Sequence, residues 1–142
     1  MPSPYLSNYG AVTWGTSTLA VTADGYAGQT IVTTIAGAQA ATMPAATGSG
    51  NIYRFFVSVT KTGNLTITTN GSDDLVGMAY VVTDGSAPPP FLSDGTDTII
   101  TMNGSTTGGV KGSWVELQDV ASATWRVTGN LISTGAEATP FS

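Results

Sequence analysis

The chain consists of short runs in which apolar and polar residues alternate, and no run of twelve residues has the apolar spacing of an amphipathic helix. In Asn51–Val59 (NIYRFFVSV), Tyr53 and Phe55 fall on the same face of an extended strand. Gly63–Asn70 (GNLTITTN) has the same two-residue period, with Leu65 pointing inward. Threonine is frequent in these runs, and its β-branched side chain favours strands. The alternation predicts an all-β fold.

Further strand patterns are separated by Gly, Asn, Asp, Ser or Pro. They are Thr18–Ala23, Thr30–Ile35, Ala41–Pro44, Leu75–Thr83, Asp97–Asn103, Ser113–Val120 and Thr124–Ile132. Many short strands at regular spacing predict an antiparallel β-sandwich or β-barrel of jelly-roll-like type. We expect two hairpins, one joining Asn51–Val59 to Gly63–Asn70 and one joining Ser113–Val120 to Thr124–Ile132.

The strand patterns span residues 18–134, which we interpret as a single β domain, since 142 residues suit one domain. Residues 1–17 are expected to form an N-terminal arm and lead-in, and residues 135–142 a C-terminal arm, because the first ten and last eight residues lack a strand pattern. Asp84–Asp97 contains three consecutive prolines, which cannot join a central strand. This segment is therefore expected to be a long interaction loop.

Charge and composition exclude several classes of protein. Four basic and nine acidic side chains give a net charge of −5, without the positive patch that nucleic-acid binding requires. The first ten residues lack the features of a secretory signal, and no apolar run approaches the length of a membrane span. We therefore expect no nucleic acid and no membrane as partners. Histidine and cysteine are both absent, which removes thiol chemistry and the commonest general base, and we expect no enzyme activity and no cofactor.

Carboxylates are the remaining candidates for catalysis or metal binding, since two of them could hydrolyse a glycosidic bond. The candidates are Asp73, Asp74, Asp94, Asp97, Glu116 and Asp119. Most lie in turns rich in Asn, Gly and Ser, where aspartate is favoured because it binds local backbone groups. The runs NGSDD and SDGTD offer oxygen ligands for calcium, but neither has the EF-hand spacing. Neither a catalytic pair nor a metal site is expected.

The stretch Asn103–Val120 (NGSTTGGVKGSWVELQDV) combines glycines with a lysine, as a phosphate-binding loop does. A Walker loop needs Gly-Lys followed by Ser or Thr and then a helix, whereas here a glycine follows Lys111 and a strand pattern comes next. We expect turn or bulge positions at the glycines, namely Gly104, Gly108, Gly109 and Gly112. Lys111 is expected to point to solvent or to a neighbouring subunit.

Three motifs resemble a known class of proteins. PAATGSGNIYRF (44–55), TKTGNLTI (60–67) and NGSTTGGVKGSWVELQDVASATWRVTGNL (103–131) are similar to motifs of small virion structural proteins of tailed bacteriophages, including capsid decoration (cement) proteins. The similarity covers about residues 41–142. It implies a β-rich protein without enzymatic activity that assembles, often as a homotrimer, on the outside of the head. There it would bind the major capsid protein and tie neighbouring capsomers together, after synthesis in the host cytoplasm.

The low content of charged residues, 9%, suits such dense packing because little charge must be desolvated at each contact. Candidate residues for the capsid or subunit interface are Pro4, Tyr5, Leu6, Tyr9, Trp14 and Phe91. The first four would anchor an arm that extends onto a neighbour. The alternative is a head fibre or tail spike module that contacts the host surface, which an exposed Phe91 beside its prolines would favour. A carboxylate-pair hydrolase is a third hypothesis.

Overall fold

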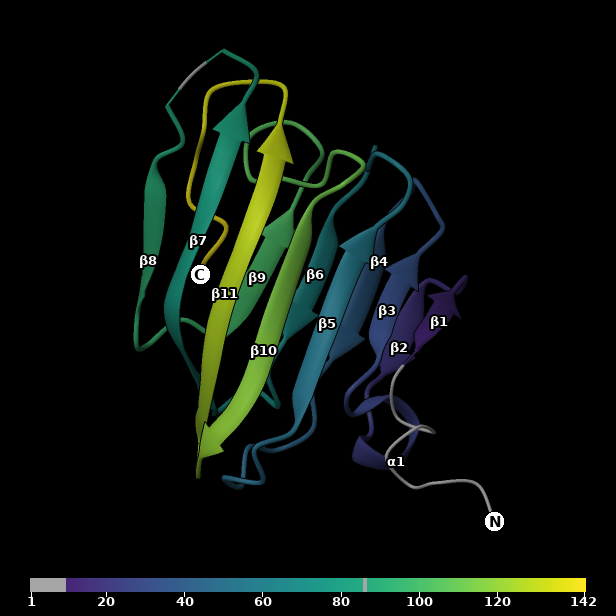
Figure 1. The fold of residues 1–142 in the computed structure, drawn as a ribbon, viewed down its shortest axis with the longest axis vertical. Helices are drawn as coiled ribbons and strands as arrows, with labels where there is room; N and C mark the ends of the chain where they lie inside the picture. Colours follow the sequence, from purple (N-terminus) through teal and green to yellow (C-terminus); the bar gives the residue numbers. More distant parts are fainter. Residues whose placement is uncertain (1–9, 86) are drawn as a thin grey trace.

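The computed structural model describes residues 10–85 and 87–142, and the chain folds into two β-sheets with one short helix (Figure 1). The all-β prediction is confirmed. The larger sheet has seven strands in the order β1-β3-β5-β10-β11-β7-β8, and the smaller has four in the order β2-β4-β6-β9. The elements are β1 (Ala11–Trp14), β2 (Thr18–Ala20), α1 (Ala23–Tyr26), β3 (Thr30–Thr33), β4 (Gln39–Thr42), β5 (Ile52–Val57), β6 (Leu65–Thr68), β7 (Asp74–Thr83), β8 (Pro90–Asp94), β9 (Ile99–Met102), β10 (Trp114–Ala121) and β11 (Thr124–Ser133).

The first six strands alternate between the two sheets, so the chain coils around the core in three successive turns. Within the larger sheet β1, β3 and β5 are parallel, and within the smaller sheet β2, β4 and β6 are parallel. Residues that pair in neighbouring turns are 19 positions apart at Ala11 and Thr30, and 24 positions apart at Thr30 and Arg54. The turns therefore differ in length.

The remaining strands extend both sheets from the third turn. In the larger sheet β10 lies antiparallel to β5, and β10 and β11 form an antiparallel hairpin, so the second predicted hairpin is confirmed. The first predicted hairpin is wrong, because β5 and β6 belong to different sheets. Five of the nine strand pairs are parallel, including β7 with β11, so a wholly antiparallel jelly-roll-like arrangement is also wrong. Connections that cross from one sheet to the other make parallel neighbours possible.

The core lies between the two layers, with the smaller sheet behind the larger in Figure 1. Inward residues alternate along each strand, as in β5, where Tyr53, Phe55 and Val57 are buried. The Tyr53 and Trp125 rings meet edge to face with centroids 5.7 Å apart, which is a favoured geometry for aromatic pairs.

Both predicted arms differ from the structure. Ala11–Trp14, inside the predicted lead-in 1–17, forms β1 at the edge of the larger sheet. Residues 135–142, expected as an arm outside the β domain, instead end against β9, where Phe141 is 5% exposed and part of the core. The Ser142 carbonyl accepts from the Ile99 N–H at 2.8 Å. Burial of one aromatic ring thus anchors the end of a segment that has no strand periodicity.

The predicted interaction loop Asp84–Asp97 contains β8, an edge strand. Pro90 begins β8 opposite Tyr80 of β7. An edge position tolerates proline because only one side of the strand needs backbone donors. Within the described ranges, no helix is long and apolar enough to cross a membrane.

Candidate functional site

Of the six interface residues expected from the sequence, the structure describes Trp14 and Phe91. Pro4, Tyr5, Leu6 and Tyr9 lie outside the described residues. Trp14 is 2% exposed and packs edge to face on Phe55, so its side chain belongs to the core of its own chain and is not offered to a partner. Phe91 is half-buried on β8 and packs against the core, so it is not the exposed aromatic that would favour a host-binding loop.

The glycine-rich stretch is a connection between strands, as expected. Gly104, Gly108, Gly109 and Gly112 all have positive φ, between 79° and 101°, which confirms them as turn positions. The Gly108 and Gly109 N–H groups donate to the hydroxyls of Ser133 and Ser113 at 2.9 and 3.1 Å. Asn103 Oδ1 accepts from the N–H groups of residues 105, 106 and 107. These loop donors, which a phosphate would need, are therefore already bound to side chains of the protein, and Lys111 is exposed.

Candidate carboxylates accept from backbone N–H groups, hydroxyls or basic side chains, and Asp73 Oδ2 accepts from the distant Ala46 N–H at 2.6 Å. Asn70 Oδ1 accepts from the Asp73 N–H in NGSDD, and Asp94 Oδ1 accepts from the N–H and hydroxyl of Thr96 in SDGTD. The bonds from Thr96 lower the pKa of Asp94. In the part of the chain that the structure describes, no group of three or more His, Cys, Asp or Glu side chains could hold a metal ion.

Asp119 holds the loop before β5 against β10. Its carboxylate accepts from the N–H groups of Thr47, Gly48 and Ser49, with Gly48 at 2.6 Å, and from the Ser49 hydroxyl at 2.6 Å. Burial would raise its pKa, but the Ser49 hydroxyl and the three backbone donors outweigh it and lower the pKa to about 2. With its oxygens occupied by these donors, the carboxylate is a structural group.

Lys61 is a buried cation without an acidic partner in the described structure, being 3% exposed. Its Nζ donates to the Ile35 carbonyl at 2.6 Å and to Gln39 Oε1. Gln39 Nε2 in turn donates to the carbonyls of Trp14 and Thr16 at 3.2 and 2.9 Å. Desolvation lowers the pKa of Lys61 to about 8. These contacts, which we name the corner ladder, join all three turns of the coil.

The outer face of β7 and β8 carries a group of exposed apolar side chains. Val76, Met78 and Tyr80 are 45, 40 and 40% exposed, and Leu92, opposite Met78 in the register, is 67% exposed. These four, which we name the β7–β8 patch, are the majority of the six large hydrophobic residues exposed in the described chain. Their inward neighbours Leu75, Ala79 and Val81 are buried. Gathered apolar side chains on a sheet face mark an interaction surface more often than scattered ones do.

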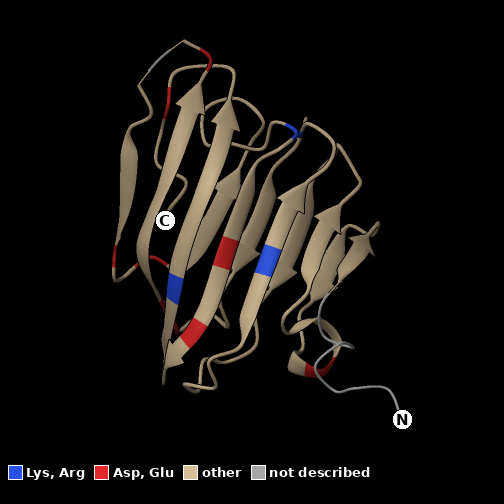
Figure 2. Ribbon diagram, viewed as in Figure 1, with Lys and Arg blue, Asp and Glu red and all other residues tan. Residues whose placement is uncertain are grey.

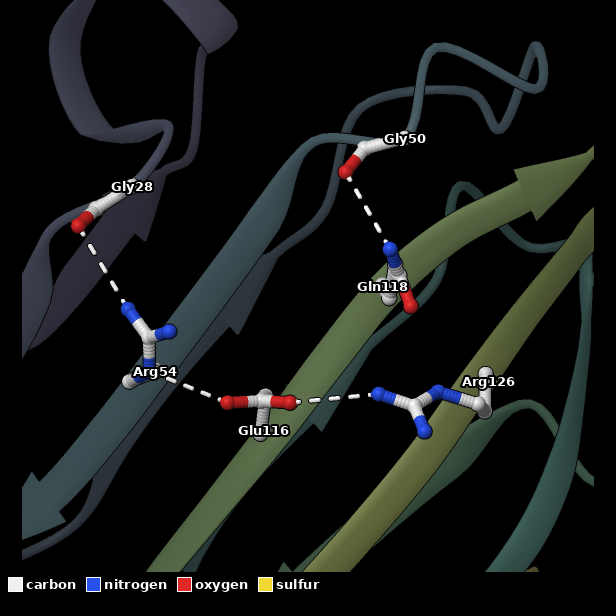
Figure 3. Close-up of polar contacts among 6 residues, drawn as sticks. All are labelled: Gly28, Gly50, Arg54, Glu116, Gln118 and Arg126. Atoms are coloured by element: carbon white, nitrogen blue, oxygen red, sulfur yellow. Dashed lines mark hydrogen bonds and ion pairs between the residues drawn. The ribbon is translucent and has the colours of Figure 1, made fainter. Parts of the chain in front are cut away.

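A row of charged residues crosses the neighbouring strands β5, β10 and β11 beside the patch (Figure 2). Glu116 of β10 accepts from Arg54 Nε of β5 at 3.0 Å and from Arg126 Nη2 of β11 at 3.3 Å (Figure 3). One carboxylate therefore serves two guanidinium groups, which leaves a local charge of +1. Arg126 lies opposite Val76 in the register, so this row borders the β7–β8 patch.

The sequence of β7 is apolar enough to supply an exposed patch, but alternation alone does not show which face of the strand is exposed. In Leu75–Thr83 both sets of alternating residues are apolar, so the period predicts a strand but not the face that stays uncovered. The topology decides which face is exposed, since β7 lies next to the edge and its outer face has no described layer above it.

No family model matches the chain, and no curated protein or solved structure is similar to it at a significant level.

Proposed function

We propose that this chain is a virion structural protein of a tailed bacteriophage that binds the outside of the head as a capsid decoration (cement) protein. Two observations support the proposal. The motifs in residues 44–55, 60–67 and 103–131 resemble that class. The β7–β8 patch supplies an exposed apolar surface, and this is the observation that carries the proposal.

The chemistry of the patch suits a protein partner. Its four members include Tyr80 and Met78, residue types that are enriched at the centres of protein interfaces, and Arg126 borders it. No member of the patch is charged, so docking would require little desolvation of charge. The partner is the major capsid protein, and copies arranged by head symmetry would add modest contacts multivalently. The protein acts there by binding and not by catalysis.

The test uses purified protein and undecorated heads of the phage that encodes it. The protein is expected to bind in a saturable, stoichiometric manner and to raise the temperature at which the heads break. Val76→Ser should weaken binding by about tenfold, since burial of a valine contributes about 1.5 kcal/mol or more. Val120→Ser is the matched control, because Val120 is also 45% exposed but lies outside the patch. Absence of head binding, or equal weakening by both variants, would contradict the proposal.

A further inference from the structure

The four outer edges of the two sheets are protected unequally. On the larger sheet β8 carries Pro90 and Asp94, and proline and charge both discourage the addition of another strand. On the smaller sheet the edge of β9 is covered by the carboxyl-terminal residues, since Ile100 and Phe141 form an antiparallel bridge. At the far side, the edges are β1 and β2.

The β1 and β2 edges lie together and have neither form of protection within the described residues. Ala11–Trp14 and Thr18–Ala20 contain no charged residue and no proline. They follow one another in the chain and lie side by side at one end of the two layers (Figure 1). No other described strand pairs with their outer sides, so both edges present extended backbone groups that can accept another strand.

The core is also incompletely covered at this end. Five partly buried hydrophobic residues pack against the core, and four of them belong to the first turn and its helix: Val12, Leu19, Tyr26 and Ala27. In a coil, each turn packs between the turn before it and the turn after it. No described turn precedes the first one, so its outer side is uncovered in the described residues. An added strand pair would therefore bury apolar surface as well as satisfy backbone hydrogen bonds.

The distribution of charge indicates which partner fits. Five of the nine acidic residues lie on β7 or β8 or in their adjoining loops (Figure 2). They are Asp73, Asp74, Asp84, Asp94 and Asp97. Near the β1–β2 end the structure places one, Asp24 on α1. Two copies that met by their β8 edges would bring like charges within the screening length of about 8 Å, whereas a meeting by β1 and β2 keeps most of them apart.

We propose that the β1–β2 edge pairs with the same edge of a second copy about a two-fold axis perpendicular to the sheets. Such an axis reverses strand direction and keeps each sheet in its own layer. β1 therefore pairs antiparallel with β1 of the partner, and β2 with β2, in one isologous contact. The four-residue and three-residue edges are only about 13 and 10 Å long, so the dimer is weak in dilute solution and forms at high local concentration.

The chain has no cysteine, so a single introduced cysteine can form a disulfide only between copies. Ala11→Cys, Thr13→Cys, Thr18→Cys and Ala20→Cys place thiols at exposed positions of the two edges. At least one of them is expected to form a disulfide-linked dimer much faster than Leu92→Cys, an exposed control on the opposite edge strand. Cross-strand pairs bring Cβ atoms within about 5 Å, which suits a disulfide.

Sedimentation equilibrium over a wide concentration range provides the second measurement. The unmodified chain should approach the mass of two chains, and Thr13→Lys should weaken the association at least tenfold without changing the unfolding temperature. Three results would overturn the proposal: equal cross-linking by Leu92→Cys, a limiting mass of three chains, or association that appears only when residues 1–9 are removed. The last result would mean that the chain covers this edge itself. None of these measurements depends on head binding, so this proposal can fail independently of the proposed function.

Discussion

Replacing Asp119 with asparagine tests how strongly one carboxylate holds the loop before β5. Asparagine has nearly the same shape, but it removes the charge and replaces one acceptor oxygen with a donor. That donor would face N–H groups and hydroxyls that already donate, such as Gly48 N and Ser49 Oγ, both 2.6 Å from the carboxylate. The variant should therefore be less stable at neutral pH.

The magnitude follows from the pKa of Asp119, which is about 2 in the folded chain against an ordinary 3.8. Each pH unit between the two values corresponds to about 1.4 kcal/mol, so ionisation of this group stabilises the fold by roughly 2–3 kcal/mol. Because the folded pKa is the lower one, this stabilisation is fully present above about pH 4. It is lost progressively as the pH falls from about 4 through the folded pKa of about 2.

The assay is urea unfolding of the natural chain and of Asp119→Asn at several pH values between 6 and 2. The difference between their free energies of unfolding should shrink by about 2 kcal/mol over this range, because at pH 2 the natural side chain is half neutral even in the folded chain. Asp84→Asn, which removes an exposed carboxylate, is the control and should show no such trend. A difference that stays constant with pH would refute the reasoning, since it would mean that shape and not charge holds the loop.

Three further substitutions test other contacts by the same unfolding measurement. Gly104→Ala should lower the free energy of unfolding by more than about 3 kcal/mol, because the new Cβ would lie 2.0 Å from the Lys61 carbonyl oxygen. Gly50 has nearly the same φ but open space around it, so Gly50→Ala should lower the free energy of unfolding by only about 1 kcal/mol. Equal losses in the two variants would contradict the predicted clash at Gly104. Lys61→Met should cost about 2–4 kcal/mol by leaving buried oxygens unpaired, so a neutral result would contradict the corner ladder. Glu116→Gln should cost less than about 1 kcal/mol, since Arg126 is largely exposed, and a larger loss would show that the ion pairs are structural.

Local sequence patterns predicted the local structure well. The predicted final hairpin of Ser113–Val120 and Thr124–Ile132 is present, and Val115, Leu117 and Trp125, at alternating positions of its strands, have 0% exposure. The turn chemistry of Gly104 and Gly108 was also readable, because positive φ favours glycine whatever surrounds it. These features depend on a residue and its close neighbours in the chain.

Apart from the final hairpin, strand partners were not predictable from the same patterns. A short link between Asn51–Val59 and Gly63–Asn70 suggested a hairpin, but inward residues on both segments serve equally well in two facing sheets. The coil also left no repeat in the sequence, since paired residues in successive turns are 19 and 24 positions apart. For the same reason the β7–β8 patch could not be identified. Along Leu75–Thr83 the inward and the outward residues are both apolar, so only the tertiary structure shows which of them are covered.

Turns of unequal length need another means of fixing their register, and the corner ladder provides one. Trp14 and Thr16 belong to the first turn, Gln39 to the second and Lys61 to the third, and side-chain hydrogen bonds connect them in that order. A slip of one turn by a residue would leave a buried ammonium or amide without acceptors, which costs more than the loss of an ordinary contact. In a chain with only four basic residues, burial of one at this corner is therefore explained by register and requires no ligand.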